Sequence, residues 1–163
     1  MIPVVSLVGR SNCGKTTYLE KLIRELKSRG YRVGTIKHDV HGFEMDKPGK
    51  DTWRHSQAGA DVVCISSPAK MAMIKKVDQE MLLDEVIACI TDVDIIFTEG
   101  YKRESKRKIE VFRAAVCDSP LCSKAELFAV ASDTVLHDDI PHFPLDDAKE
   151  MADFLAQSLL QTK

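Results

Sequence analysis

"PVVSLVGRSNCGKTTYLEKLI", residues 3–23, is the stretch that decides the fold. Its first part, Pro3 to Val8, is a short apolar run with two adjacent valines, which is typical of a buried strand. The run ends at a glycine, and a polar segment follows. After that segment, apolar residues recur at the spacing of one helix face: Tyr18, Leu19, Leu22, Ile23 and Leu26. A buried strand that passes through a glycine turn into an amphipathic helix predicts an α/β domain.

The turn between that strand and that helix has the pattern of a phosphate-binding loop. Gly9-x-x-x-x-Gly14-Lys15-Thr16 matches G-x-x-x-x-G-K-[ST] at every defined position. In such a loop, backbone N–H groups and the helix N-terminus form a cradle for an anion. The lysine reaches the β- and γ-phosphates, and the threonine hydroxyl binds Mg²⁺. We therefore predict these nucleotide-binding residues, with Lys15 also catalytic: Gly9, Arg10, Ser11, Asn12, Cys13, Gly14, Lys15, Thr16 and Thr17.

Strands and helices alternate along the rest of the chain. Apolar runs predict strands at Arg32 to Lys37, within 60–66 and 70–76, and at "DIIFTE", "IEVFRAA" and "LFAVASD". Helical periodicity predicts helices over 78–90, with Asp78 as the N-cap, over 146–160 and, in short form, at Thr52 to Ala58. The expected fold is therefore α/β, three-layered and P-loop NTPase-like, with a mainly parallel sheet. We expect residues 1–163 to form a single P-loop nucleotide-binding domain.

Polar clusters follow several of these strands, after Val8, Lys37, Thr98 and Ser132. Ligands of parallel α/β sheets bind beyond the carboxyl ends of the strands, so we expect these clusters to meet at one edge. Glu99 lies at such a strand end, facing the phosphate loop, and its carboxylate suits Mg²⁺, which prefers oxygen ligands. We predict Glu99 as a catalytic and metal-binding residue; an exposed loop glutamate is the alternative.

A long polar segment, His38 to Ala60, follows the second strand. Long loops in compact domains are usually functional or mobile. The segment contains His38, His41 and His55 together with several carboxylates, but their spacing does not fix a transition-metal site on one helix face. A loop that becomes ordered over a triphosphate and Mg²⁺ is the more economical interpretation.

Composition narrows the classes of function. The 163 residues are 44% hydrophobic and 29% charged, with a net charge of −2, so composition does not support a general nucleic-acid or anionic-membrane role. No apolar run approaches membrane-spanning length, and the first residues lack the basic region of a signal peptide. The five cysteines form no C-x-x-C pair, as expected for reduced thiols. We expect a cytoplasmic protein with neither nucleic-acid nor membrane partners.

Three stretches together resemble one family: "LVGRSNCGKTTYLEKLI", "GTIKHDVHGFEMDKPGKDTWRHSQAGA" and "FTEGYK". They are similar to the MobB family of molybdopterin-guanine dinucleotide biosynthesis adapter proteins, from the first strand through the "KIEVFR" strand. The middle stretch is the distinctive one, because a phosphate loop alone is generic. The resemblance implies a GTP-binding homodimer with weak GTP hydrolysis, which assists MobA in attaching GMP to molybdopterin.

The resemblance also implies roles for particular residues. Thr16, Asp51 and Glu99 would hold the Mg²⁺, by similarity to the wider group of P-loop proteins that includes dethiobiotin synthetase and the MinD-type ATPases. Lys37, at the end of the second strand, would contact a phosphate or the substrate. Asp39 is a second choice for the metal.

No motif fixes the residue that reads the base. GTPases commonly use N-K-x-D, which this chain lacks. Asp133 follows Ser132 at the end of a strand on the expected edge, so its carboxylate is our predicted hydrogen-bond acceptor for guanine. A turn aspartate is the other interpretation.

We expect at most a slow Mg²⁺-dependent GTPase, because Lys15 is the one cation that the motif secures at the phosphates. Further candidates for a phosphate contact are Arg10, Lys37, Lys102 and Arg103. The competing function is an ATP-dependent small-molecule kinase or ligase of the P-loop class.

Two segments keep two interpretations each. "VVCISSPAKMAMI" either pairs with a second copy through edge strands or belongs to the main sheet. The basic run from Lys102 to Lys108 either meets an anionic ligand or acidic partner, or is a solvated hairpin loop.

Overall fold

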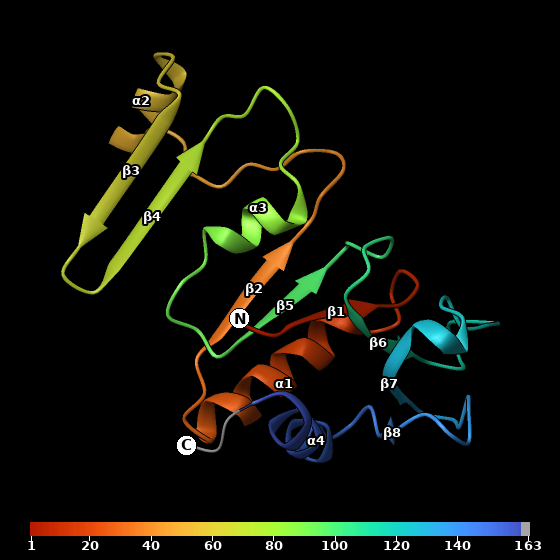
Figure 1. Ribbon diagram of the computed structural model, residues 1–163. Helices are drawn as coiled ribbons and strands as arrows, with labels where there is room; N and C mark the ends of the chain where they lie inside the picture. The colour runs from red at the N-terminus through yellow and green to blue at the C-terminus, as the bar shows by residue number, and fades with distance from the viewer. Residues whose placement is uncertain (161–163) are drawn as a thin grey trace. The chain divides into compact units, whose positions relative to one another are not determined.

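Six strands form one sheet in the computed structural model, which describes residues 1–160 (Figure 1). The strands are β1 (Val4–Val8), β2 (Val33–Lys37), β5 (Ile95–Glu99), β6 (Arg107–Phe112), β7 (Leu127–Ser132) and β8 (His142–Phe143). Their order is β2-β5-β1-β6-β7-β8, and every pairing is parallel. Because all six run in the same direction, their carboxyl ends share one edge, as the polar clusters predict.

Helices cover both faces of this sheet and give the fold three layers. α1 (Lys15–Ser28) and α4 (Lys149–Leu159) lie on one face, and α3 (Leu83–Ala88) lies on the other (Figure 1). Fully buried side chains fill the first interface, among them Val5, Leu7, Leu22, Leu26, Phe97, Met151 and Leu155. A smaller core beneath α3 contains Ile36, Leu83 and Ile96. Burial of each such side chain contributes about 1.5–3 kcal/mol. The predicted α/β fold with a mainly parallel sheet is confirmed.

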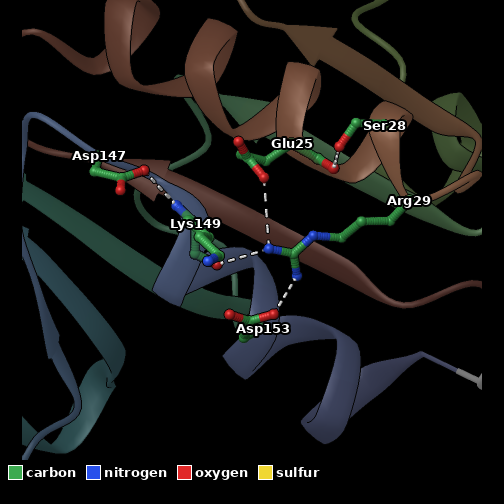
Figure 2. Close-up of polar contacts among 6 residues, drawn as sticks. All are labelled: Glu25, Ser28, Arg29, Asp147, Lys149 and Asp153. Carbon is green, nitrogen blue, oxygen red and sulfur yellow. Dashed lines mark hydrogen bonds and ion pairs between the residues drawn. The ribbon is translucent and has the colours of Figure 1, made fainter.

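Arg29 joins the end of α1 to α4, as Figure 2 shows. Its guanidinium lies 2.6 Å from Asp153 and 3.5 Å from Glu25, and it donates to the carbonyl oxygen of Lys149 at 3.0 Å. Asp147 accepts the N–H of Lys149 at 2.9 Å and so fixes the start of α4. A single exposed ion pair contributes about 0–1 kcal/mol, but here one partly buried guanidinium makes three contacts. These contacts hold the end of α1 that is farther from the phosphate loop.

The helix predicted over 78–90 is present as α3 but is shorter than the sequence pattern indicates, so only its predicted start, with Asp78 as the N-cap, is wrong. The helix begins at Leu83, and the negative charges of Asp84 and Glu85 in its first turn interact favourably with the positive end of the helix dipole. Leu82 is 71% exposed instead of lying on the apolar face. Residues up to Leu82 belong to a second compact unit of the chain, and α3 begins at the residue that follows it.

That second unit is Asp39–Leu82, and the remainder of the described chain forms the first. Asp39–Leu82 contains α2 (Asp51–Gln57), where the sequence predicts a short helix, and an antiparallel hairpin of β3 (Val62–Ser67) and β4 (Lys70–Lys75). The hairpin forms a sheet of its own, so the interpretation that it belongs to the main sheet is wrong. The single domain predicted for residues 1–163 stays a prediction. Of the helices within residues 1–160, none is long and apolar enough to cross a membrane.

The basic run between β5 and β6 is a crossover and not a hairpin loop, because those two strands flank β1 on opposite sides. Two of its cations are paired: Lys106 Nζ lies 2.5 Å from Asp84, and Lys108 Nζ lies 2.6 Å from Glu126. The hydrogen bond from Lys108 is the largest of the contacts that lower the pKa of Glu126 to about 2. Lys106 and Lys108 of the basic run therefore form ion pairs within the fold.

Candidate nucleotide-binding site

The loop after β1 turns sharply because three of its residues have positive φ. The values are 147° at Gly9, 63° at Asn12 and 95° at Gly14. A Cβ on Gly9 would lie 2.4 Å from the carbonyl oxygen of Val111 and 2.8 Å from Cys13 Sγ, well inside contact distance. The loop therefore packs directly against the backbone of β6. The first glycine of the motif is required by steric fit as well as by conformation.

The N-terminus of α1 has no capping side chain. Its N-cap is Gly14, and the first turn contains no acidic residue. The first N–H groups of the helix are therefore left for another acceptor. Unsatisfied amides at the positive end of a helix attract an anion, phosphate above all. This geometry suits the cradle predicted over Gly9 to Thr17.

Lys15 lies across this loop. Its Nζ donates to the carbonyl oxygens of Gly9 at 3.1 Å and Arg10 at 2.8 Å, and it lies 4.0 Å from Cys13 Sγ. Burial raises the pKa of the Cys13 thiol, and the attraction of Lys15 offsets this only in part. Cys13 is fully buried, so its thiol packs within the loop.

Thr16 and Glu99 come together at the carboxyl edge of β5. Thr16 Oγ1 lies 3.3 Å and 3.4 Å from the two carboxylate oxygens of Glu99. Glu99 pairs in register with Leu7, and one residue earlier in each strand the buried hydroxyls of Ser6 and Thr98 hydrogen-bond at 2.8 Å. A hydroxyl beside a carboxylate offers the hard oxygen ligands that Mg²⁺ prefers. These two residues fit the predicted metal.

β2 places Lys37 next to Glu99, because the two Cα atoms pair in the parallel ladder. The N–H of His38 donates to the carbonyl oxygen of Glu99 at 2.8 Å, and its ring stacks on Tyr101 with centroids 4.7 Å apart. Gly100 has φ 110°, and a Cβ there would lie 2.9 Å from both the Cβ and the carbonyl oxygen of His38. The glycine after Glu99 therefore allows the ends of β2 and β5 to pack closely.

Asp51 and Asp39, the other predicted metal residues, lie in the second compact unit. Asp51 begins α2 with 90% of its side chain exposed, and Arg54 lies 4.0 Å away. Asp39 accepts the N–H of His41 at 2.9 Å, a local turn contact. Their roles at a metal stay predictions. Within residues 1–160, no group of three or more His, Cys, Asp or Glu side chains is arranged to hold a metal ion.

Asp133 and Arg10 both contact segments that follow β6. Asp133 Oδ1 accepts the N–H of Ala114 at 2.8 Å. Arg10 donates to the carbonyl oxygen and the hydroxyl of Ser119, at 3.2 Å and 3.1 Å. One oxygen of Asp133 thus has a structural task, in line with the turn interpretation. Base recognition by Asp133 and phosphate contact by Arg10 stay predictions.

Arg113 is a cation at this edge that the sequence analysis missed. It directly follows β6, and its Nη2 lies 3.9 Å from the position that a Cβ would take on Gly14. The side chain is partly buried. Its sequence signal is an arginine directly after the apolar run "IEVF", at the edge where ligands of parallel sheets bind. The structure therefore places Arg113 at the phosphate loop, in addition to Lys15 and Arg10, which belong to the loop sequence itself.

A strand, a glycine loop and a helix at the carboxyl edge of a three-layer parallel sheet define a protein with a P-loop NTPase-like α/β fold. Comparison with known families makes this class more specific. The family model described as "MobB: Molybdopterin guanine dinucleotide synthesis protein B" matches residues 4–133. The chain belongs to the MobB family.

Individual relatives agree with this assignment. A molybdopterin-guanine dinucleotide biosynthesis adapter protein from Escherichia coli strain K12 is 37% identical over 163 residues, which cover 96% of this chain and 93% of that protein. Its Haemophilus influenzae counterpart is 35% identical and covers 94% of this chain and 88% of its own length. The crystal structure of Bacillus subtilis MobB has a TM-score of 0.75 at 24% identity, covers 99% of this chain and all of its own, and supports the fold.

Proposed function

We propose that this chain is a cytoplasmic GTP-binding adapter protein with slow GTPase activity, which assists MobA in attaching GMP to molybdopterin. The observation that carries the proposal is the contact between Thr16 and Glu99 beside the uncapped N-terminus of α1. A phosphate cradle next to a hydroxyl–carboxylate pair suits a nucleoside triphosphate with Mg²⁺. The adapter role is supported by the names of the two bacterial relatives.

Binding of the polyphosphate is the main task of the proposed site. The N–H groups from Gly9 to Thr17 and the ammonium group of Lys15 would hold the phosphates, while Thr16 and Glu99 would hold the Mg²⁺. Bound Mg²⁺ neutralises charge on the β- and γ-phosphates. Asp133 would read guanine with the oxygen that does not hold Ala114. Selectivity for GTP over ATP is the part of the proposal that depends on this residue.

Slow hydrolysis follows from the groups around the predicted phosphates. Among residues 1–160, the side chains of Lys15 and Thr16 contact the loop itself and Glu99, and neither contacts a glutamine or histidine side chain that could orient a water molecule. An arginine supplied by a partner raises the rate of such enzymes about 10³- to 10⁵-fold. Turnover of the proposed GTPase would therefore depend on assembly with its partner.

The hairpin of β3 and β4 supports the homodimer that the proposal includes. Val62, Met71 and Met73 share one of its faces by register and are 49%, 66% and 55% exposed. Exposed apolar groups on a two-stranded ribbon mark a surface that pairs with another chain. Analytical ultracentrifugation should show a dimer for the wild type and a weakened dimer for Met73→Glu. Equal dimerisation of the two proteins would show that the hairpin is not part of the dimer interface.

The adapter role is tested by affinity capture from an extract that contains MobA, with and without GTP and Mg²⁺. We expect recovery of MobA or of pterin with the wild type, and loss of the GTP-dependent part with Lys15→Ala. Lys27→Ala, a change of the same kind at an exposed position of α1, should behave as the wild type. Recovery of neither MobA nor pterin contradicts the adapter role. Rapid phosphate transfer from ATP to a small molecule would establish the kinase alternative instead.

A further inference from the structure

We propose that Arg113 is a nucleotide-binding residue that contacts the α- and β-phosphates from the flank of the phosphate loop opposite the Mg²⁺ site. The inference deepens the proposed function and rests on it. It adds a cation to the site at a position that the phosphate-loop motif does not include.

The guanidinium of Arg113 has the features of an anion-binding group. It is partly buried, and its Nη2 lies 3.9 Å from the position of a Cβ on Gly14, the N-cap of α1. Among residues 1–160, no side chain or carbonyl oxygen forms a hydrogen bond or an ion pair with it. A partly desolvated cation with no partner is unfavourable, and here it lies beside amides that also attract negative charge. A bound phosphate would satisfy both groups.

The strand order places Arg113 relative to the metal. β1 has β5 on one side and β6 on the other. Glu99, which contacts Thr16, ends β5, whereas Arg113 follows the last residue of β6. Mg²⁺ bridges the β- and γ-phosphates, so the terminal phosphates lie toward Glu99. The part of the nucleotide nearer the nucleoside therefore extends toward β6 and Arg113.

The backbone around Arg113 is fixed before any ligand arrives. Its carbonyl oxygen accepts the N–H groups of Val116 and Cys117, both at 3.0 Å, in a turn whose Cys117 is 4% exposed. The next residue, Ala114, donates its N–H to Asp133 at 2.8 Å. A preorganised backbone lowers the entropy that binding must overcome.

The far end of the same segment is held by a buried carboxylate. Glu110 is 1% exposed, and its two oxygens accept the N–H groups of Leu121 at 2.5 Å and Cys122 at 3.1 Å. Hydrogen bonds from backbone N–H groups thus hold the segment at both ends, and none of them involves the guanidinium of Arg113. Replacement of the Arg113 side chain should therefore leave the segment in place.

The test measures dissociation constants for GTP, GDP and ATP, each with Mg²⁺, for the wild type and Arg113→Gln. Loss of a charge-assisted contact predicts about 10- to 100-fold weaker binding of both GTP and GDP, by the same factor. Arg113→Lys should recover part of the affinity, because the charge remains and the planar fork is lost. Arg24→Gln, on the exposed face of α1 with Glu20 3.3 Å away, is the matched control and should bind as the wild type.

Each other outcome overturns the inference in a recognisable way. If wild type and Arg113→Gln bind the nucleotides with equal affinity and unfold at the same temperature, Arg113 is not a nucleotide-binding residue. The proposed function is unaffected by that result. A loss confined to GTP would place the guanidinium on the γ-phosphate, and a loss larger for GTP than for ATP would place it at the base. A wild type that binds none of the three nucleotides contradicts the proposed function itself, together with this inference.

Discussion

Replacement of Gly9 by alanine is the sharpest structural test of the phosphate loop. The new Cβ would lie 2.4 Å from the carbonyl oxygen of Val111, where ordinary contacts begin near 3.4 Å. The two backbones must therefore separate by about 1 Å. β6 cannot retreat freely, because it is hydrogen-bonded to β1 on one side and to β7 on the other.

Two effects add in this variant. Overpacking of a filled site destabilises by about 1–3 kcal/mol. A non-glycine residue at the φ of 147° found here costs about another 1–3 kcal/mol. We expect Gly9→Ala to lose about 2–6 kcal/mol of unfolding free energy, a large part of the roughly 5–15 kcal/mol typical of native proteins.

Urea unfolding at neutral pH, followed by circular dichroism, measures this loss. Gly30→Ala is the matched control, because Gly30 also has positive φ, 83°, but no atom lies within 4 Å of the new Cβ. Backbone strain alone predicts a loss of about 1–2 kcal/mol there. If Gly9→Ala and Gly30→Ala lose the same stability, the close approach of the loop to β6 is not real.

Three further predictions concern the sheet and the metal. Thr16→Val should weaken GTP binding about tenfold with Mg²⁺ present, and much less with EDTA, because only the metal-binding hydroxyl is lost; equal weakening in both titrations would remove Thr16 from the metal. Ser6→Ala leaves the buried hydroxyl of Thr98 unpaired and should lower the unfolding free energy by about 1–3 kcal/mol. The double variant Ser6→Ala/Thr98→Val should lose less than the sum of the two single losses, which a double-mutant cycle of urea unfolding measures. Hydrogen bonds from Lys108, the largest contribution, and from Ser123 lower the pKa of Glu126 from an ordinary 4.5 to about 2. The stabilisation from these contacts is therefore complete above pH 4.5 and disappears as the pH falls through about 2. Lys108→Met should flatten that part of the stability–pH curve, and an unchanged curve would contradict the role of this pair.

The phosphate loop and the parallel sheet could be predicted from the sequence because their signals are local. The motif from Gly9 to Thr16 and the apolar run before it need no information from distant residues. The contact between Thr16 and Glu99 could be anticipated because parallel strands bring their carboxyl ends to one edge.

Features that depend on distant segments could not be predicted in this way. The strand pattern gives no reason for the buried position of Glu110, because the two N–H groups that satisfy it come from Leu121 and Cys122. The short β8 has only two residues and too little pattern to detect. The start of α3 at Leu83 coincides with the boundary between two compact units of the chain, and periodicity does not show that boundary. The proximity of Arg113 to Gly14 follows from the pairing of β6 with β1 and not from the local sequence around either residue.

We propose that Lys15, Thr16 and Glu99 form a Mg²⁺-dependent site for GTP. Its most direct test is calorimetric titration of the wild-type chain with GTP and with ATP, each in the presence and absence of Mg²⁺. We expect saturable binding of GTP that requires Mg²⁺ for full affinity and is tighter than the binding of ATP. Absence of heat with GTP, or tighter binding of ATP, would contradict it.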